Sequence, residues 1–155
     1  MSLALDPSFS HAPGPDLLGK LSRAVGAALA LGITAVHVVD QGGLIGDKGP
    51  RYVGVGYWLL ELAGIAVAVL LLSGRLQRPT WLLAAGVGAG PMLGYVLSRG
   101  PGMPGYVDDR GNWTEPIGLI SLGLEAALIL LAAAMLARRA QVAASPVPAG
   151  ADAAH

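Results

Sequence analysis

The sequence contains no cysteine, which excludes disulfides, thiolate catalysis, thiol redox switching and cysteine-ligated clusters. Charged residues make up only 13% of the 155 residues, whereas a soluble domain usually carries about a quarter. Ten basic and ten acidic residues give a formal net charge of zero, so nothing indicates binding to nucleic acid or to lipid headgroups. Aromatic residues reach only 5%, so the packing of this chain must depend on small and aliphatic side chains.

Four long apolar segments account for most of the chain. They cover approximately residues 21–40, 52–73, 80–98 and 116–137. Each is close to the ~20 residues that an α-helix needs to cross the hydrocarbon core of a bilayer. Helices are also the only open-chain structures that satisfy their backbone polar groups in lipid. The sequence therefore predicts an all-α membrane protein, a bundle of four transmembrane helices.

Two other readings of these segments fit less well. A soluble bundle of buried helices is disfavoured because none of the segments has a charged face. The first segment resembles a signal peptide in having Lys20 and Arg23 before it. It starts late, runs long and is not followed by a small-residue cleavage site and a soluble domain, so a transmembrane helix is the better interpretation.

The transmembrane domain is expected to span residues 20–139, between two tails. The tails, 1–19 and 140–155, are rich in proline, alanine and serine and are predicted to be disordered. The histidines in these tails, His11 and His155, receive no role.

Lys and Arg are distributed unequally between the two ends of the helices. Six belong to one side: Lys20, Arg23, Arg75, Arg78, Arg138 and Arg139. Four belong to the other: Lys48, Arg51, Arg99 and Arg110. Because the side richer in Lys and Arg stays in the cytoplasm, both termini are expected to be cytoplasmic. The segment between the third and fourth helices would then face outward, with Tyr106 and Trp113 near the interface.

Two carboxyl groups lie deep in apolar sequence. Glu61 comes nine residues after Tyr52, and Glu125 comes nine residues after Pro116, which places each ~13 Å below the outer boundary. An ionisable group at that depth costs at least ~2.5 kcal/mol, so a functional role is the first hypothesis. Facing each other, the two groups would share a proton or bind a cation. The alternative is a protonated carboxyl that donates a hydrogen bond between helices.

Further polar residues accompany these acids. Tyr57 and Ser121 each lie four residues before a glutamate, on the same helical face. His37 and Asp40 are three residues apart near the outer end of the first helix. His37 suits a proton relay or a metal ligand, and equally an interface histidine with satisfied hydrogen bonds. The candidate metal ligands are His37, Asp40, Glu61 and Glu125. One membrane histidine excludes a haem with two histidine ligands within one protomer.

Charged residues flank the segment between the third and fourth helices. Arg99 ends the third helix, with Tyr95 one turn before it, and Glu115 precedes Pro116 at the start of the fourth. Arg99 is expected to pair with Asp40, Glu115 or Asp108 and to close the bundle, although it could also contribute to binding. The full set of candidate binding residues is His37, Asp40, Tyr57, Glu61, Tyr95, Arg99, Glu115 and Glu125.

Glycines recur along the third segment. Gly86, Gly90 and Gly94 follow each other at four-residue spacing, which favours the close approach of a neighbouring helix. Pro91 lies within this run and predicts a local kink that frees a backbone carbonyl.

The string GYVLSRGPGMPG, followed by NWTEPIGLISLGLEAALILL and preceded by HVVD, resembles a family of small, uncharacterised four-helix bacterial integral membrane proteins. The resemblance covers roughly residues 30–130 and lies in a Gly-Tyr-x-x-Ser-Arg turn, a Trp-x-Glu-Pro helix start and a later Glu. It implies a shared pattern at Gly94, Tyr95, Ser98, Arg99, Trp113, Glu115, Pro116 and Glu125. The turn departs from the pattern in its Gly100-Pro101-Gly102 sequence. The family implies a place in the inner membrane of a bacterium, and it implies no activity.

Three functional hypotheses follow. The first is a membrane protein with an outward-facing acidic site that binds a proton, a cation or a small polar solute, for transport or sensing. The second is a non-catalytic accessory subunit, with the bilayer and either further copies or a larger membrane complex as its partners. An enzyme is the least favoured, because scattered carboxylates and one histidine make a weak metal site and Ser98 or Ser121 belongs to no catalytic motif. No cofactor is identified.

Overall fold

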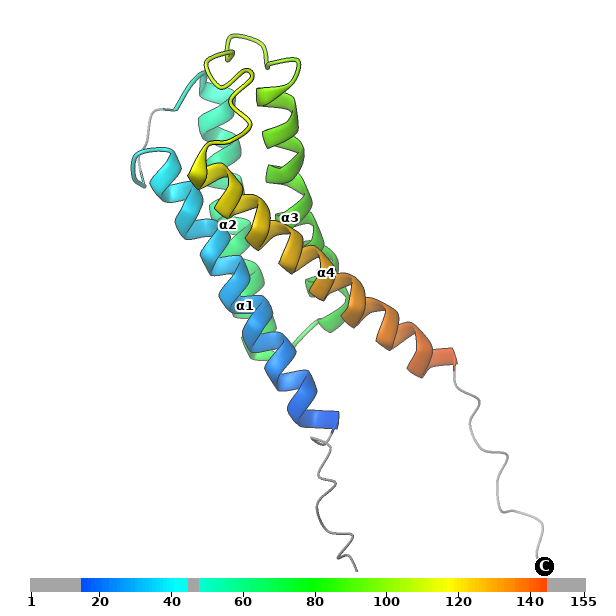
Figure 1. Cartoon of the computed structure of the whole chain (residues 1–155). Coiled ribbons are helices and arrows are strands. Elements are labelled where there is room, and N and C mark those ends of the chain that lie inside the picture. The colour runs from blue at the N-terminus through cyan, green and yellow to red at the C-terminus, as the bar shows by residue number, and fades with distance from the viewer. Residues whose placement is uncertain (1–14, 45–47, 145–155) are drawn as a thin grey trace, which may run out of the picture.

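The computed structural model describes residues 15–44 and 48–144, which form four helices (Figure 1). These are α1 (Pro15–Asp40), α2 (Arg51–Ser73), α3 (Gln77–Arg99) and α4 (Pro116–Ala144). Each helix packs against its neighbours in the chain, and α4 returns to pack against α1. The prediction of an all-α four-helix bundle is confirmed.

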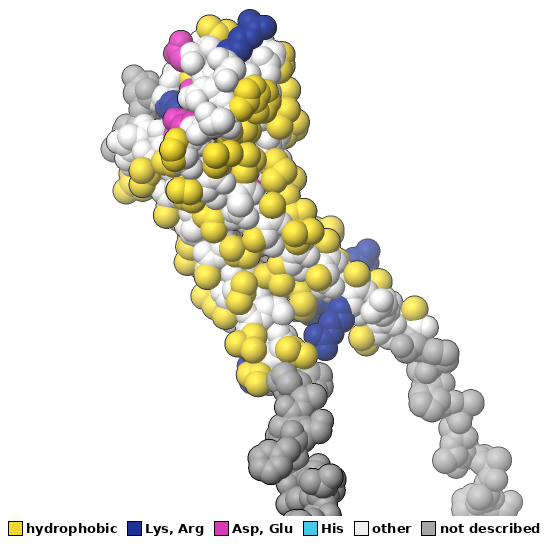
Figure 2. Space-filling view, viewed as in Figure 1, with side chains coloured by type: hydrophobic (Ala, Val, Ile, Leu, Met, Phe, Trp, Pro, Cys, Tyr) yellow, Lys and Arg dark blue, Asp and Glu magenta, His cyan; other side chains and the backbone are white. Residues whose placement is uncertain are grey.

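All four helices are long and apolar enough to cross a membrane. Large apolar side chains are exposed along their outer surfaces, among them Leu31, Leu62, Val69 and Leu130. Figure 2 shows apolar side chains along the length of the bundle, with Lys and Arg side chains towards both ends and acidic side chains towards the end formed by the segment between α3 and α4. This distribution is the one expected of a multi-pass membrane protein.

Two helices extend beyond their predicted bounds. Helix α1 begins at Pro15 and α4 continues to Ala144, so residues 15–19 and 140–144 are helical and do not belong to the tails. Proline is well suited to the first turn of a helix, where its missing N–H costs nothing. The end of α4 contains alanine, arginine and glutamine, which are strong helix formers. His11 and His155 lie outside the described residues.

The apolar core lies in the half of the bundle nearer the α2–α3 turn. Its largest fully buried side chains are those of Trp81, Leu71, Ile33 and Leu128. A Cβ atom added to Gly26 would lie 2.9 Å from Leu71 and 3.0 Å from Trp81, so only glycine lets α1 approach this closely. Apart from Thr80, the buried polar residues lie towards the opposite half of the bundle.

The glycines of α3 do not pack as expected. A Cβ added to Gly86, Gly90 or Gly94 would meet nothing within 4 Å. Gly88 makes the close approach instead, since its added Cβ would lie 2.8 Å from the carbonyl oxygen of Glu125 on α4. The α4-facing side of α3 is therefore set by Gly88, and the four-residue glycine run faces elsewhere. Pro91 lies within a continuous α3.

Residues 100–115, here called the cap, fold over the polar end of the bundle. Met103 and Tyr106 exchange backbone hydrogen bonds of 3.0 and 2.9 Å. The Tyr52 hydroxyl of α2 donates to the Pro104 carbonyl at 2.8 Å. Gly49 has φ +69° and its added Cβ would lie 2.6 Å from the Tyr106 ring, so this position requires glycine. The cap is thus tied both to α2 and to the segment before it.

Candidate functional site

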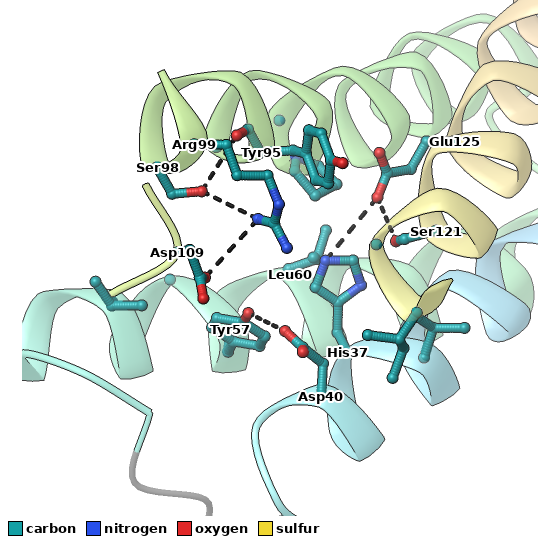
Figure 3. A pocket seen from close by; sticks show the side chains of 18 of the residues that line it. His37, Asp40, Tyr57, Leu60, Tyr95, Ser98, Arg99, Asp109, Ser121 and Glu125 are labelled. Carbon is teal, nitrogen blue, oxygen red and sulfur yellow. Dashed lines mark hydrogen bonds and ion pairs between the residues drawn. The ribbon is translucent and has the colours of Figure 1, made fainter. Parts of the chain in front are cut away.

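A cavity of about 300 Å³ lies beneath the cap and is lined by all four helices. Six of the eight predicted binding residues line it: His37, Asp40, Tyr57, Tyr95, Arg99 and Glu125 (Figure 3). Ser98, Tyr106, Asp109 and Ser121 also contribute to its wall. Glu61 and Glu115 do not line it.

Asp40, at the end of α1, is neutralised by its neighbours. Lys48 Nζ lies 2.6 Å from Asp40 Oδ1, and the Tyr57 hydroxyl donates a hydrogen bond to Oδ2. The ring of Tyr57 lies 5.4 Å from that of His37, centroid to centroid. Asp40 is therefore part of a paired polar cluster and has little remaining capacity for a ligand.

Arg99 closes the polar end of the bundle. Its side chain is 7% exposed and lies 4.0 Å from the centre of the Tyr95 ring. It donates to the Glu115 carboxylate and, through Nε, to the Asn112 carbonyl at 2.9 Å. Asp109 Oδ2 lies 3.8 Å from Arg99 Nη1.

Among the predicted acidic partners of Arg99, the pair with Glu115 is confirmed. Asp40 instead bonds Lys48 and Tyr57, and the cap supplies Asp109 where the sequence suggested Asp108. With these partners, Arg99 joins α3 to the start of α4 and to the cap.

Glu125, on α4, is the least satisfied acid of the cavity. The residue is 1% exposed, and Ser121 Oγ donates to its Oε1 at 2.6 Å. Its other oxygen, Oε2, is buried without a hydrogen-bond partner within residues 15–44 and 48–144. His37 Nε2 lies 3.9 Å from Oε1, which is too long for a direct hydrogen bond (Figure 3).

The hydrogen bonds of His37 determine which ring nitrogen faces Glu125 as an acceptor. Its Nδ1 lies 2.9 Å from the Ile33 carbonyl oxygen, which can only accept, so Nδ1 carries a hydrogen. In the neutral ring Nε2 is therefore an acceptor, and it becomes a donor only when the ring is protonated. A small group with hydrogens to donate, placed between Nε2 and the carboxyl, could bond to both.

Glu61 is placed differently from Glu125, in spite of the matching depth. It is buried and accepts a hydrogen bond from Gln41, which follows α1 directly. Gly64, one turn further on the same face, packs against α1, where its added Cβ would lie 3.2 Å from the Ala30 carbonyl. Glu61 thus faces α1 and not Glu125, so the condition for a proton or cation shared between the two glutamates is not met.

The four candidate metal ligands do not form one centre. The described part of the chain contains no group of three or more His, Cys, Asp or Glu side chains placed to hold a metal ion. Asp40 is bonded to Lys48 and Tyr57, and Glu61 lies outside the cavity, so within the described residues His37 and Glu125 are the pair of candidate ligands found within 4 Å of each other. The metal hypothesis is therefore not supported by this geometry.

Some residues of the site were not identified as such from the sequence. Tyr106 is buried in the cap, and its hydroxyl donates to Asp109 Oδ2 at 2.6 Å. Burial, and then this hydrogen bond, raise the pKa of the Tyr106 hydroxyl, so it stays a neutral donor. The Asp109 carboxylate joins Tyr106 to Arg99. The only sequence signal was their three-residue spacing, which carries no information on how the cap folds.

The charges around the cavity are unbalanced. Four carboxyl groups lie in or beside it, those of Asp40, Asp109, Glu115 and Glu125, against the two fixed cations Lys48 and Arg99. Lys48 bonds one of these acids, and Arg99 lies against two others. Glu125 is left with a serine hydroxyl and a distant imidazole. The site therefore favours a ligand that is positively charged or donates hydrogen bonds.

Comparison with known proteins adds no relative. No protein-family model, no curated protein and no solved structure matches this chain.

Proposed function

We propose that this chain is an integral membrane protein whose acidic cavity binds a proton, a cation or a small polar solute, for transport or sensing. The observation that carries the proposal is Glu125 Oε2, a buried carboxyl oxygen in the cavity with no partner among the described residues. Glu125 and His37 are the binding residues, and Asp40, Tyr57, Tyr95 and Arg99 shape the cavity around them.

The energetics support a ligand at this position. Leaving a buried acceptor without a hydrogen bond costs ~1–3 kcal/mol, and an ionised carboxylate within a bilayer costs more. A ligand that donates to Oε2 removes this cost. The cavity, at about 300 Å³, falls at the small end of the range for small-molecule sites.

The proposed topology places both termini in the cytoplasm of a bacterium. Its support is the excess of Lys and Arg at the ends of the helices opposite the cap, six against four. The cap and the cavity beneath it then lie on the outer side of the cell membrane. The resemblance to small four-helix bacterial membrane proteins agrees with this assignment and is itself part of the proposal.

The alternative function is that of an accessory subunit within a larger membrane complex. Gly86 favours it, because this exposed glycine has nothing within 4 Å of an added Cβ and would admit a helix from another chain. The paired groups around Arg99 would then serve only to hold the bundle together.

Native mass spectrometry of the full chain in lipid nanodiscs separates the two functions. The variants are Glu125→Gln and, as the matched control, Glu61→Gln, which alters a carboxyl of similar depth outside the cavity. We expect a bound small molecule or cation in wild type and Glu61→Gln that is absent in Glu125→Gln. A bound proton is detected instead as a carboxyl infrared band that titrates with pH and disappears in Glu125→Gln.

The opposite result would support the accessory subunit. All three proteins would then carry no ligand and show no titrating band, while remaining associated with further copies or other subunits.

A further inference from the structure

The wall of the cavity between α2 and α3 is made partly of glycine. Gly56 on α2 and Gly90 and Gly94 on α3 all line the cavity. A Cβ added to any of them would meet nothing within 4 Å, and Gly56 and Gly90 are also exposed at the surface of the bundle. The cavity wall is therefore open at these glycines, and the space beside them, here called the α2–α3 gap, holds no side chain within 4 Å of an added Cβ.

This gap lies at the level of Glu125. Gly90 lies ~3 Å further along α3 than Gly88, whose added Cβ would be 2.8 Å from the Glu125 carbonyl oxygen, and Gly90 lines the cavity together with Glu125. On the other helix, Gly56 precedes Tyr57, whose ring lies 5.4 Å from that of His37. Because one cavity is lined by these glycines and by Glu125 and His37, the opening and the Glu125–His37 pair belong to the same space.

The surface around the gap is apolar and lies within the candidate membrane spans. Leu59 on α2 and Leu93 on α3 are 63% and 60% exposed on the outside of the bundle. In a bilayer the gap would open to hydrocarbon. An occupant that extends through it must be polar at the Glu125 end and apolar at the other.

Resting on the function proposed above, we infer that the site takes a primary amine with an apolar chain, the ammonium at Glu125 and the chain in the α2–α3 gap. An ammonium group has three hydrogens to donate. The acceptors available to it are Glu125 Oε2, without a partner in the described residues, and Glu125 Oε1 and His37 Nε2, which lie 3.9 Å apart. An anionic head would find both fixed cations around the cavity already paired, Arg99 with Glu115 and Lys48 with Asp40.

The test measures binding of isotope-labelled methylamine and octylamine to the full chain in lipid nanodiscs, with empty nanodiscs subtracted. Gly90→Leu fills the gap with a side chain. Gly86→Leu is the matched control, because Gly86 lies one turn earlier in the same glycine run, is equally open and does not line the cavity. Gly56→Leu fills the gap from the other helix and serves if Gly90→Leu fails to fold.

Wild type is expected to bind both amines. Gly90→Leu should weaken octylamine binding by about tenfold or more, because the leucine side chain takes the space that the alkyl chain needs and overpacking of that kind is worth at least a factor of about ten. It should leave methylamine binding within about twofold, since methylamine has no chain to place in the gap. Gly86→Leu should change neither.

Three results would overturn the inference, and they are distinguishable. If Gly90→Leu and Gly56→Leu bind octylamine as wild type does, the alkyl chain does not use the gap. Binding of methylamine would still support the Glu125 site. If these variants instead lose self-association with octylamine binding unchanged, the gap packs against a second copy. If wild type binds neither amine, or Glu125→Gln binds both as well, the proposed function fails together with the inference.

Discussion

The closure of the cap by Arg99 can be tested by removing each partner of its ion pair in turn. The Arg99 side chain is 7% exposed and that of Glu115 is 28% exposed. Arg99→Gln leaves the more exposed Glu115 without its cation, together with Asp109 and the Asn112 carbonyl. Removing one member of a buried ion pair leaves the charge of the other without compensation. The free energy of unfolding should therefore fall by ~3 kcal/mol.

Glu115→Gln should cost less, ~1–2 kcal/mol, although Arg99 is the more deeply buried partner. The reason is that Arg99 keeps Asp109 at 3.8 Å, the Asn112 carbonyl and the Tyr95 ring in this variant. The order of the two effects, Arg99→Gln above Glu115→Gln, follows from these remaining partners.

The assay is reversible unfolding in mixed micelles of sodium dodecyl sulfate and a mild detergent, followed by circular dichroism and by tryptophan fluorescence. Trp113 reports the cap, since its ring packs edge-on against Tyr95 at 5.9 Å. Arg110→Gln is the control: this exposed cap arginine makes one long bond to the Gly100 carbonyl, so its loss should cost less than ~0.5 kcal/mol. The reasoning is refuted if Arg99→Gln costs no more than Arg110→Gln.

Two further predictions concern helix contacts and are checked by the same unfolding assay. Gly88→Ala should destabilise the bundle by ~1–3 kcal/mol, because the new Cβ would lie 2.8 Å from the α4 backbone, whereas Gly86→Ala, with nothing within 4 Å, should be neutral or slightly stabilising. Equal effects of the two would contradict the assigned packing face. Tyr57→Phe should cost ~1–2 kcal/mol by removing a hydrogen bond to Asp40, which retains Lys48, and an unchanged stability would contradict that bond.

The number and approximate position of the helices could be predicted from the sequence, because a run of about 20 apolar residues has few alternatives to a membrane helix. The outer limits of α1 and α4 could not. Past residue 137 the chain remains rich in helix formers, and hydrophobicity does not register a helix that continues beyond the lipid. The start of α1 at Pro15 could not be predicted for the same reason, because it lies in a segment whose composition is typical of a disordered tail.

The hydrophobic pattern did not predict which side of each helix packs against its neighbours. All four segments are apolar around most of their circumference, so no polar face marks the outside. Glu61 and Glu125 therefore looked equivalent by depth, yet one faces α1 and Gln41 while the other enters the cavity. The glycines show the same limit: the spacing of Gly86 and Gly90 suggested packing, but Gly88 makes the contact.

The fold of the cap could not be predicted from the sequence. Its residues were correctly singled out as polar and aromatic, and the pair of Arg99 with Glu115 was among those expected. The choice of Asp109 over Asp108 depends on turns at Gly102, Gly105 and Gly111, all of which have positive φ. Such backbone conformations can be suspected from glycine but cannot be assembled into a particular loop from spacing alone.

The central claim, that a ligand meets Glu125, is tested most directly by infrared difference spectroscopy of the full chain in nanodiscs with and without methylammonium. The account predicts a change in a carboxyl or carboxylate band on binding that is present in wild type and in Glu61→Gln and absent in Glu125→Gln. A band that persists in Glu125→Gln, or no band in wild type, would contradict it.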